Sequence, residues 1–412
     1  MPSPLPSAER ALRATPGPPL DLDPGADPLC GSSIRTLVER YGSPLLLVDA
    51  VRLRRQHARL AAALPGVALH FAVKSLPHPT VCAVLGEAGA CFDLATSGEV
   101  SIMRRLGIAP ERCIHTHPIK RDVDIRNALD YGVTRFVADN VEELRKLARW
   151  RGRIEVLLRV AFRGREALCD LSRKFGCEPA EVPALIEAAR ALGLDVLGLS
   201  FHAGSQAASP ERHVQAIATC AELLGAAAAA GCPLRVLDIG GGFPSDYGSG
   251  GAAGGTVVPS LEAFCAPIRA ALAALPADLQ LLAEPGRILS APAAVAVASV
   301  MGRAEREGRR WYYLDDGLYG SYSGLMFDRV RYPIEALVAD GPRFPSVLAG
   351  PTCDSVDVID EDIALPVLET GDLVVGRAMG AYTWASASEF NLFPRARVLV
   401  MDQGRRRTEG EA

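Results

Sequence analysis

The chain has 412 residues, of which 49% are hydrophobic and 22% are charged, and its formal net charge is −4. This length is too great for one ordinary domain, and the composition is that of a globular protein rather than a fibrous or disordered one. The sequence has no basic block and no apolar run of membrane-spanning length, which argues against nucleic acid and membrane as partners.

The two ends of the chain differ in composition from the rest. Residues 1–30 are rich in proline, alanine and glycine and lack the apolar core of a signal peptide, so we expect a disordered tail. Residues 403–412 are expected to form a second, charged tail. The ten cysteines are scattered without metal-ligand spacing, so no metal site is expected, and reduced thiols predict a cytoplasmic protein.

Between the tails, two patterns follow each other. Residues 31–49 hold a short helical stretch and an apolar strand. Eight apolar runs then alternate with helical stretches, at 69–73, 90–94, 112–115, 134–138, 154–160, 195–201, 234–239 and 279–283. This α/β alternation predicts a (β/α)8 TIM-like barrel over residues 50–287, although a doubly wound sheet would show the same rhythm. Short strands between glycine and proline turns predict a C-terminal all-β domain over residues 288–402, which the N-terminal strand is expected to join.

In such a barrel, the active site lies at the carboxyl ends of the strands. Lys74 follows the first predicted strand. It is either a lysine that reaches the surface or a buried amine whose pKa is lowered so that it can form a Schiff base. The other strand ends carry chemically active residues or glycines, namely Asp93, His115, His117, Asp139, Arg159, His202, Ser205, Gly240, Gly241, Gly242, Glu284 and Arg287.

Three of these features together indicate pyridoxal phosphate chemistry. Lys74 supplies an amine for a Schiff base. The glycines at 240–242, with Ser205 and Arg287, are suited to a phosphate group. Glu284 can hold a pyridine nitrogen protonated, although a structural ion pair with Arg287 is the alternative. His202 is either a core histidine whose hydrogen bonds are satisfied within the protein or a flat ring that lies beside the cofactor.

Seven short motifs resemble the pyridoxal phosphate decarboxylases of the alanine-racemase fold (fold type III). They are FAVK at 71–74, CFDLATSGE at 91–99, SFHAGS at 200–205, LDIGGGFP at 237–244, EPGR at 284–287, GPTCDS at 350–355 and MGAYT at 379–383. The last two resemble the ornithine decarboxylase branch of the ornithine/diaminopimelate/arginine decarboxylases. The resemblance extends over about residues 33–402, nearly the whole predicted folded chain.

The resemblance implies a role for each cofactor contact. Lys74 would carry the cofactor, His202 would stack on its ring and Glu284 would pair with the ring nitrogen. The further cofactor contacts that the resemblance implies are Asp93, Arg159, Ser205, Gly240, Gly241, Gly242, Gly286, Arg287 and Tyr382, with Glu99 as a supporting residue.

The resemblance also implies a homodimer whose active sites are shared between subunits. Cys353 would protonate the carbanion after carbon dioxide leaves. Asp354 would reach into the partner's site and bind the distal amine of the substrate. Asp328 would contact that amine from the home subunit, and Phe327 is also predicted to be a substrate-binding residue. The implied reaction is decarboxylation of L-ornithine to putrescine in polyamine biosynthesis, with L-lysine to cadaverine second.

One triplet departs from the pattern of this branch. Residues 327–329 read Phe-Asp-Arg where amine-specific members tend to read Tyr-Asp-His. Arg329 either points away and pairs with another acid, or neutralises Asp328, or binds a substrate carboxylate. A decarboxylase of a modified or carboxylated amino acid, such as a diaminopimelate-like or secondary-metabolite precursor, is therefore the alternative. An inactive regulatory homologue is more remote, because Lys74 and the other cofactor contacts are present.

Overall fold

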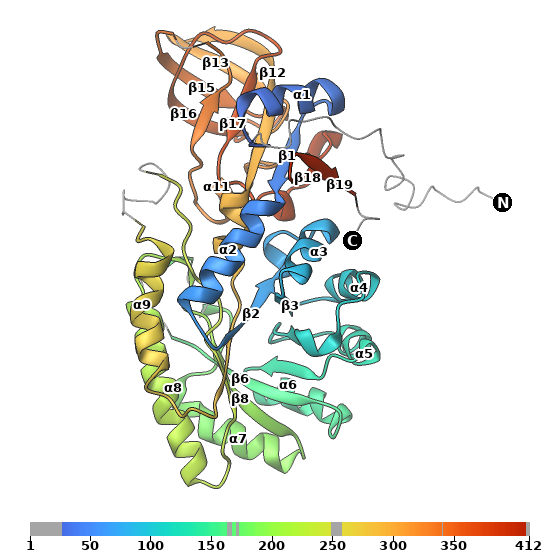
Figure 1. The fold of residues 1–412 in the computed structure, drawn as a ribbon, viewed down its shortest axis with the longest axis vertical. Coiled ribbons are helices and arrows are strands. Elements are labelled where there is room, and N and C mark those ends of the chain that lie inside the picture. The colour runs from blue at the N-terminus through green and yellow to red at the C-terminus, as the bar shows by residue number, and fades with distance from the viewer. Residues whose placement is uncertain (1–26, 163–166, 170–172, 249–257, 340, 409–412) are drawn as a thin grey trace, which may run out of the picture.

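The computed structural model describes residues 27–162, 167–169, 173–248, 258–339 and 341–408. Residues 1–26 and 409–412, which hold most of the first predicted tail and the end of the second, lie outside this set. Figure 1 shows an α/β part and a β-rich part stacked along the long axis of the molecule.

The α/β part is a closed barrel of eight parallel strands. In spatial order they are β10 (Val236–Asp238), β11 (Gln280–Ala283), β2 (Val67–Ala72), β3 (Cys91–Leu94), β4 (Cys113–His115), β5 (Arg135–Ala138), β6 (Glu155–Val160) and β8 (Asp195–Phe201). The barrel closes because β8 pairs with both β6 and β10. The eight predicted runs therefore form the barrel and not an open sheet, and this prediction is confirmed.

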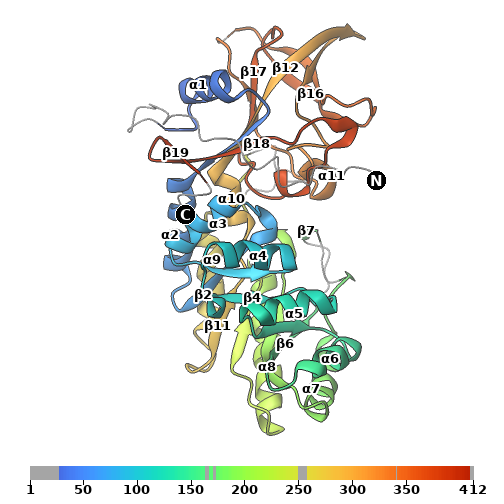
Figure 2. The ribbon, with the colours of Figure 1, turned by 90° about the vertical axis from the view of Figure 1, so that its right-hand side faces the viewer.

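Helices surround the barrel (Figure 2), and several begin at a side-chain cap. They are α2 (Ala50–Ala63), α3 (Pro79–Glu87), α4 (Ser97–Arg105), α5 (Asp122–Tyr131), α6 (Val141–Leu147), α7 (Val182–Ala191), α8 (Glu211–Ala229) and α9 (Leu261–Leu272). Asp49, Thr96 and Asn140 accept hydrogen bonds from free backbone N–H groups in the first turns of α2, α4 and α6. Each cap of this kind stabilises its helix by about 1 kcal/mol.

Apolar side chains fill the barrel below the site. Six neighbouring strands contribute one buried side chain each to a cluster inside the barrel, which consists of Ile114, Val137, Leu157, Leu197, Val236 and Leu282. This packed interior leaves the carboxyl ends of the strands as the place where polar side chains can meet a ligand.

The β-rich part is a nine-stranded sheet. Its main path runs β16 (Val358–Leu365), β15 (Phe344–Ala349), β13 (Arg309–Leu314), β12 (Ala294–Arg306), β1 (Leu45–Asp49), β18 (Arg397–Asp402) and β19 (Arg405–Arg407), and β17 (Leu373–Gly376) pairs with β12 and β14 (Ile334–Ala336). The predicted N-terminal strand joins this sheet, since Leu46 lies opposite Ala296 of β12 and Val398 of β18. Helix α1 (Gly31–Tyr41) packs on one face of the sheet through Ile34 and Leu37.

Parts of both predicted tails are ordered. Leu29 is only 1% exposed and packs with α1, and residues 405–407 form β19, which pairs with β18. Arg407 also forms an ion pair with Glu87 of α3 at 2.6 Å. Charge alone suggested a free tail, but the edge of β18 offers backbone partners to any following strand. Among the described helices, none is both long and apolar enough to cross a membrane.

Candidate active site

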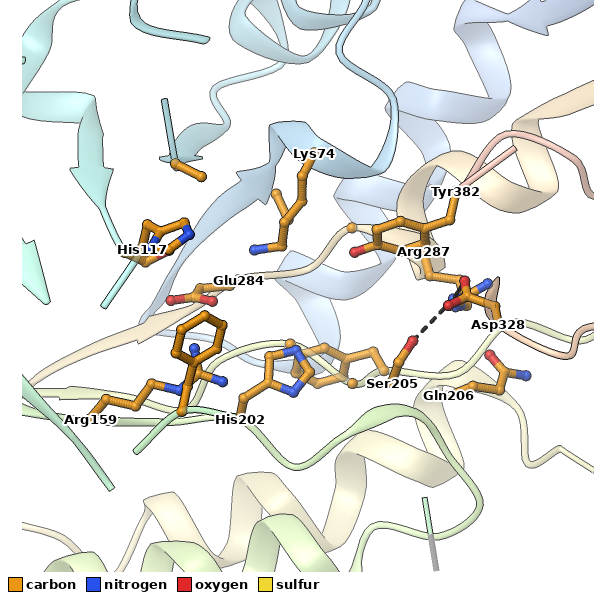
Figure 3. A pocket seen from close by; sticks show the side chains of 18 of the residues that line it. Lys74, His117, Arg159, His202, Ser205, Gln206, Glu284, Arg287, Asp328 and Tyr382 are labelled. Carbon is orange, nitrogen blue, oxygen red and sulfur yellow. Dashed lines mark hydrogen bonds and ion pairs between the residues drawn. The ribbon is translucent and has the colours of Figure 1, made fainter. Parts of the chain in front are cut away.

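A cavity of about 270 Å³ lies where the carboxyl ends of the barrel strands meet the β-rich part (Figure 3). Side chains from both parts line it. The barrel contributes, among others, Lys74, Thr116, His117, Arg159, Phe175, His202, Ser205, Gln206, Gly241, Gly242, Glu284, Gly286 and Arg287, and the β-rich part contributes Asp328 and Tyr382. The structure thus brings together residues that are more than 300 positions apart in the sequence.

Lys74 lines this cavity and forms an ion pair with Asp93. It lies in the 3₁₀ turn Val73–Ser75 that follows β2, and its Nζ donates to Asp93 Oδ2 at 2.7 Å. Asp93 is 2% exposed and also accepts a hydrogen bond from Thr116 Oγ1. Burial by itself would lower the pKa of Lys74, but the carboxylates of Asp93 and Glu284 outweigh it and raise the pKa above its ordinary value. The expectation of a lowered pKa is therefore wrong, and Lys74 must give up a proton before it can attack a carbonyl carbon.

Glu284 is a buried carboxyl with a second carboxyl beside it. It follows β11, is 8% exposed, and its pKa is raised well above the ordinary value by burial and by Asp238. Asp238 is fully buried at the end of β10, accepts a hydrogen bond from the Gly240 N–H at 2.9 Å, and has a pKa raised by burial to about 6. Lys74 and Arg159 act in the opposite direction, but burial and the neighbouring carboxyl outweigh them, so the ionised form of Glu284 needs a directly paired cation. Glu284 forms no ion pair with Arg287 in the described part of the chain, so a cationic ring nitrogen meets its requirement better than the structural alternative.

His202 presents a neutral ring to the cavity (Figure 3). Its Nδ1 accepts a hydrogen bond from the Gly204 N–H at 3.0 Å. Burial and the nearby cations Arg159 and Lys74 lower the pKa of His202 well below its ordinary value. The side chain lines the cavity, so of the two interpretations left open by the sequence, the flat ring beside a ligand is the one that the geometry favours.

The glycines after β10 are required by the backbone. Gly240 and Gly242 have φ angles of +65° and +102°, which side-chain-bearing residues rarely adopt. A Cβ at these positions would lie 2.0 Å from the Phe201 carbonyl oxygen and 2.4 Å from the Gly204 carbonyl oxygen. Gly241, between them, lines the cavity directly. Gly240 and Gly242 therefore let this turn pack against the backbone at the end of β8 and just after it. Gly241 and Gly242 line the cavity, whereas Gly240, which was also predicted to contact the cofactor, does not.

Arg287 is the cation at this end of the cavity. Its guanidinium donates to Tyr247 Oη at 2.9 Å and to Ser205 Oγ at 3.0 Å, and its Cζ lies 4.9 Å from the centre of the Tyr382 ring. The Nε is buried without an acceptor in the described part of the chain. A guanidinium, a hydroxyl and glycine backbone next to one another suit a phosphate group.

The remaining predicted cofactor contacts lie around the same cavity. Arg159 lines it from β6, and burial lowers the pKa of its guanidinium. Gly286 lines it too, and a Cβ there would lie 3.0 Å from the Ser75 Cβ. Glu99 lies behind Asp93, where burial raises its pKa to about 7 and its carboxylate accepts the Ala95 N–H.

The sequence missed several residues of the site. Phe175 and Tyr247 carry no motif that marks them, and Asp238, although it lies within the motif at 237–244, was given no role, because the contribution of each comes from contacts across the barrel. Phe175 packs on the His117 ring, with 5.4 Å between the ring centres, and lies 5.5 Å from the Arg159 Cζ. Only His117 had a visible signal, since it follows a predicted strand.

The triplet at 327–329 divides between the cavity and the surface. Asp328 lines the cavity and forms an ion pair with Arg287 at 2.5 Å. Phe327 is 63% exposed and does not line the cavity. Arg329 is exposed, has a φ of +53°, and makes no ion pair in the described part of the chain. Arg329 does not line the cavity, which agrees with the first of the three alternatives, but among the described residues no acid pairs with it as that alternative predicted.

Cys353 and Asp354 lie outside the cavity of their own chain. Cys353 is exposed, and its backbone N–H donates to Asn391 Oδ1 at 3.0 Å. Asp354 accepts a hydrogen bond from Tyr319 Oη at 2.5 Å. Neither side chain lines the cavity around Lys74, so a single chain does not bring the predicted proton donor to the predicted amine.

Comparisons with known proteins agree with this geometry. Residues 50–291 match the family model for the pyridoxal binding domain of pyridoxal-dependent decarboxylases. The chain is 34% identical over 374 residues to the lysine/ornithine decarboxylase of Selenomonas ruminantium, covering 91% of this chain and 93% of that protein. It is 35% identical over 362 residues to antizyme inhibitor 2 of Xenopus laevis, covering 84% of this chain and 78% of that protein. The crystal structure of lysine/ornithine decarboxylase from Vibrio vulnificus in complex with putrescine is similar with a TM-score of 0.85 and 50% identity, covering 90% of this chain and 98% of that one.

Proposed function

Because the chain belongs to the family of pyridoxal-dependent decarboxylases, in the ornithine decarboxylase branch, we propose that it converts L-ornithine to putrescine, with L-lysine to cadaverine as its second reaction. The enzyme is a carboxy-lyase that uses pyridoxal phosphate and acts on basic amino acids. The observation that carries the proposed substrate is Asp328, a carboxylate in the same cavity as Lys74.

The side chains of the cavity fit the cofactor. Pyridoxal phosphate supplies an electron sink for the electrons that remain on the α-carbon when carbon dioxide leaves. Lys74 would bind its aldehyde carbon, and Glu284 would hold its ring nitrogen protonated. His202 would cover one face of the ring. Ser205, Gly240, Gly241, Gly242, Arg287 and Tyr382 would bind its phosphate, and Asp93 and Arg159 would fix the positions of the lysine and the ring.

Two proton positions follow from the same contacts. Asp93 Oδ2 accepts a hydrogen bond from Lys74 Nζ at 2.7 Å and so holds the ammonium in place and favours its protonated form. The carboxyl of Glu284, beside the carboxyl of Asp238, already has a strong tendency to hold a proton. The chain therefore provides one carboxylate that holds the amine in place and one carboxyl that would share a proton with the ring nitrogen.

A basic substrate also needs a counter-charge for its distal ammonium, since an unpaired charge in a buried site is costly. Asp328 is the carboxylate from the β-rich part that reaches the cavity. Asp354 of the partner subunit would be the second. Arg329 lies outside the cavity, so the cavity lining of one chain gives no support to an alternative substrate whose distal carboxylate that residue would bind.

We infer that the active site is shared between two copies of the chain. Cys353 and Asp354 lie on the surface next to an exposed apolar segment, because the Cys353 N–H is bonded to Asn391 and Phe390 stacks on Tyr319. The neighbouring Leu392 is 90% exposed. An apolar surface beside unused catalytic side chains is what a shared site would leave on a single chain.

Mixing two inactive variants tests the shared site. Lys74→Ala and Cys353→Ala would damage opposite halves, so each mixed dimer would retain one intact site. Random exchange of subunits should restore about a quarter of the wild-type rate of amine formation, because half of the dimers are mixed and each of these has one intact site of two.

The matched control mixes Lys74→Ala with Glu284→Gln. Both substitutions lie in the same half of the site, so this mixture should stay inactive. Equal recovery in the two mixtures, or a monomeric mass of the active protein in solution, would rule out the shared site.

A substrate panel tests the proposed reaction. Purified protein is incubated separately with L-ornithine, L-lysine, L-arginine and diaminopimelate, and the amine products are measured by mass spectrometry. We expect kcat/KM for ornithine and lysine to exceed that for diaminopimelate by about 10²-fold or more, because a distal carboxylate would meet Asp328 unpaired. Absence of any amine product would refute the proposed reaction, and a faster reaction of diaminopimelate would refute the proposed substrate.

A further inference from the structure

The guanidinium of Arg287 is held in place by contacts at both of its terminal nitrogens. Its side chain is 4% exposed, and it donates to Tyr247, Ser205 and Asp328 while it lies over the Tyr382 ring. Burial alone would lower the pKa of Arg287, but Tyr247 and Asp328 raise it above its ordinary value. Asp328 is the carboxylate in this set, so it balances the charge of the cation.

Because of this ion pair, the carboxylate of Asp328 lies next to both the predicted phosphate site and the predicted amine subsite. The same Nη2 of Arg287 donates to Ser205 Oγ at 3.0 Å and to Asp328 Oδ2 at 2.5 Å. Ser205 and Arg287 are the side chains suited to the cofactor's phosphate, and Asp328 is the carboxylate suited to the substrate's distal ammonium. Figure 3 shows Asp328 and Ser205 on the same side of the cavity, next to Arg287.

A bound phosphate and Asp328 would therefore compete for the same cation, Arg287. Two anions at one buried guanidinium repel each other. If one of them pairs with a second cation, the repulsion falls and the other anion binds the guanidinium more strongly. A distal ammonium is such a partner for Asp328. Its side chain is 16% exposed, against 4% for Arg287, so it lies nearer to solvent than the cation that it neutralises.

We propose that Asp328 couples the phosphate site to the amine subsite, so that phosphate at Arg287 frees Asp328 for a distal ammonium, and an ammonium at Asp328 frees Arg287 for phosphate. This inference rests on the proposed function only for the identity of the amine. By linkage, each ligand must strengthen the binding of the other by the same factor. The amine subsite then reaches full strength only in enzyme that has phosphate bound at Arg287.

Calorimetric titration of the full-length protein, freed of cofactor, tests the coupling with two simple probes. Inorganic phosphate is titrated with and without saturating cadaverine, and cadaverine is titrated with and without phosphate. In the wild type we expect each ligand to tighten the other about fivefold or more. If neither ligand changes the affinity of the other, or if one ligand weakens the binding of the other, the wild-type data alone would overturn the proposal.

Variants of Asp328 identify its part in the coupling. In Asp328→Asn we expect phosphate alone to bind about fivefold or more tightly than in the wild type, because its competitor for Arg287 is gone, and the coupling factor to fall to about one. Asp328→Glu keeps the carboxylate and should retain coupling. Coupling that persists in Asp328→Asn, or phosphate binding that weakens there, would contradict the proposal.

Glu335→Gln is the matched control. Glu335 belongs to the same stretch of chain and also pairs with an arginine, Arg377, but it does not line the cavity. Its replacement removes the same charge and should leave the coupling unchanged, whereas an equal loss in this variant would show that general electrostatics and not Asp328 is responsible. The phosphate arm needs no substrate, so its outcome is separate from that of the substrate panel.

Discussion

Replacing Lys74 by alanine should lower kcat by about 10⁴-fold or more, the upper end of what a positioned acid–base group contributes. The lysine would both bind the cofactor covalently and move protons, and its Nζ is the amine that the structure places against Asp93. The rate of carbon dioxide release and the visible absorbance of the bound cofactor are measured together.

The variant Lys74→Arg distinguishes the role of the amine as a nucleophile from the role of its positive charge. The guanidinium keeps a cation beside Asp93, so the fold and the local electrostatics should persist, but it cannot act as the nucleophile. We expect this variant to lose activity almost as completely as Lys74→Ala. Substantial activity in either variant, with the absorbance of covalently bound cofactor retained, would exclude Lys74 as the cofactor-binding residue.

Replacing Glu284 by glutamine should lower kcat by about 10²–10³-fold, as expected when one group that stabilises developing charge is removed. The carboxylate would pair with a protonated ring nitrogen, and a neutral amide would favour the unprotonated ring. The ring would then withdraw electrons less well from the α-carbon. Cofactor binding should fall far less than kcat, because the contacts of Arg287 and Ser205 at the phosphate end are unchanged.

Glu284→Asp provides the comparison for this variant. This variant keeps the negative charge but moves it back by one methylene, so its kcat should lie between that of the wild type and that of Glu284→Gln. A titration of cofactor absorbance in each variant shows whether binding or chemistry is impaired. Equal rates in the wild type and Glu284→Gln would show that the ring nitrogen does not depend on this carboxyl.

Local patterns were sufficient for the framework of the molecule. Each of the eight predicted barrel strands exists, because an apolar run bounded by turn residues has few other ways to bury itself. The glycines at 240–242 were singled out because exposed backbone N–H groups suit a phosphate, whereas the φ angles and the opposing carbonyl oxygens that exclude a Cβ at 240 and 242 are seen only in the fold. Residues 405–407 were misread as part of a tail because their charges hide a strand that the edge of β18 induces.

Electrostatic properties were the least predictable part of the site. Burial of Lys74 suggested a lowered pKa, but Asp93 and Glu284, which come from other strands, reverse the direction. Asp238 was not singled out because its effect on Glu284 arises between neighbouring strands. Such effects depend on distances across the barrel, which no local pattern contains.

The sequence by itself indicated the eight strands of the barrel, the strand β1 that joins the sheet, and candidate groups for pyridoxal phosphate, because each of these depends on side-chain periodicity or on a residue type at a strand end. Closure of the barrel was decided by the tertiary structure, because an open sheet would show the same periodicity. Only the tertiary structure decided which groups meet. It paired Asp328 with Arg287, turned Arg329 to the surface, and left Cys353 outside the cavity of its own chain. Pairing of charges is set by distance in the folded chain, and sequence order does not fix that distance.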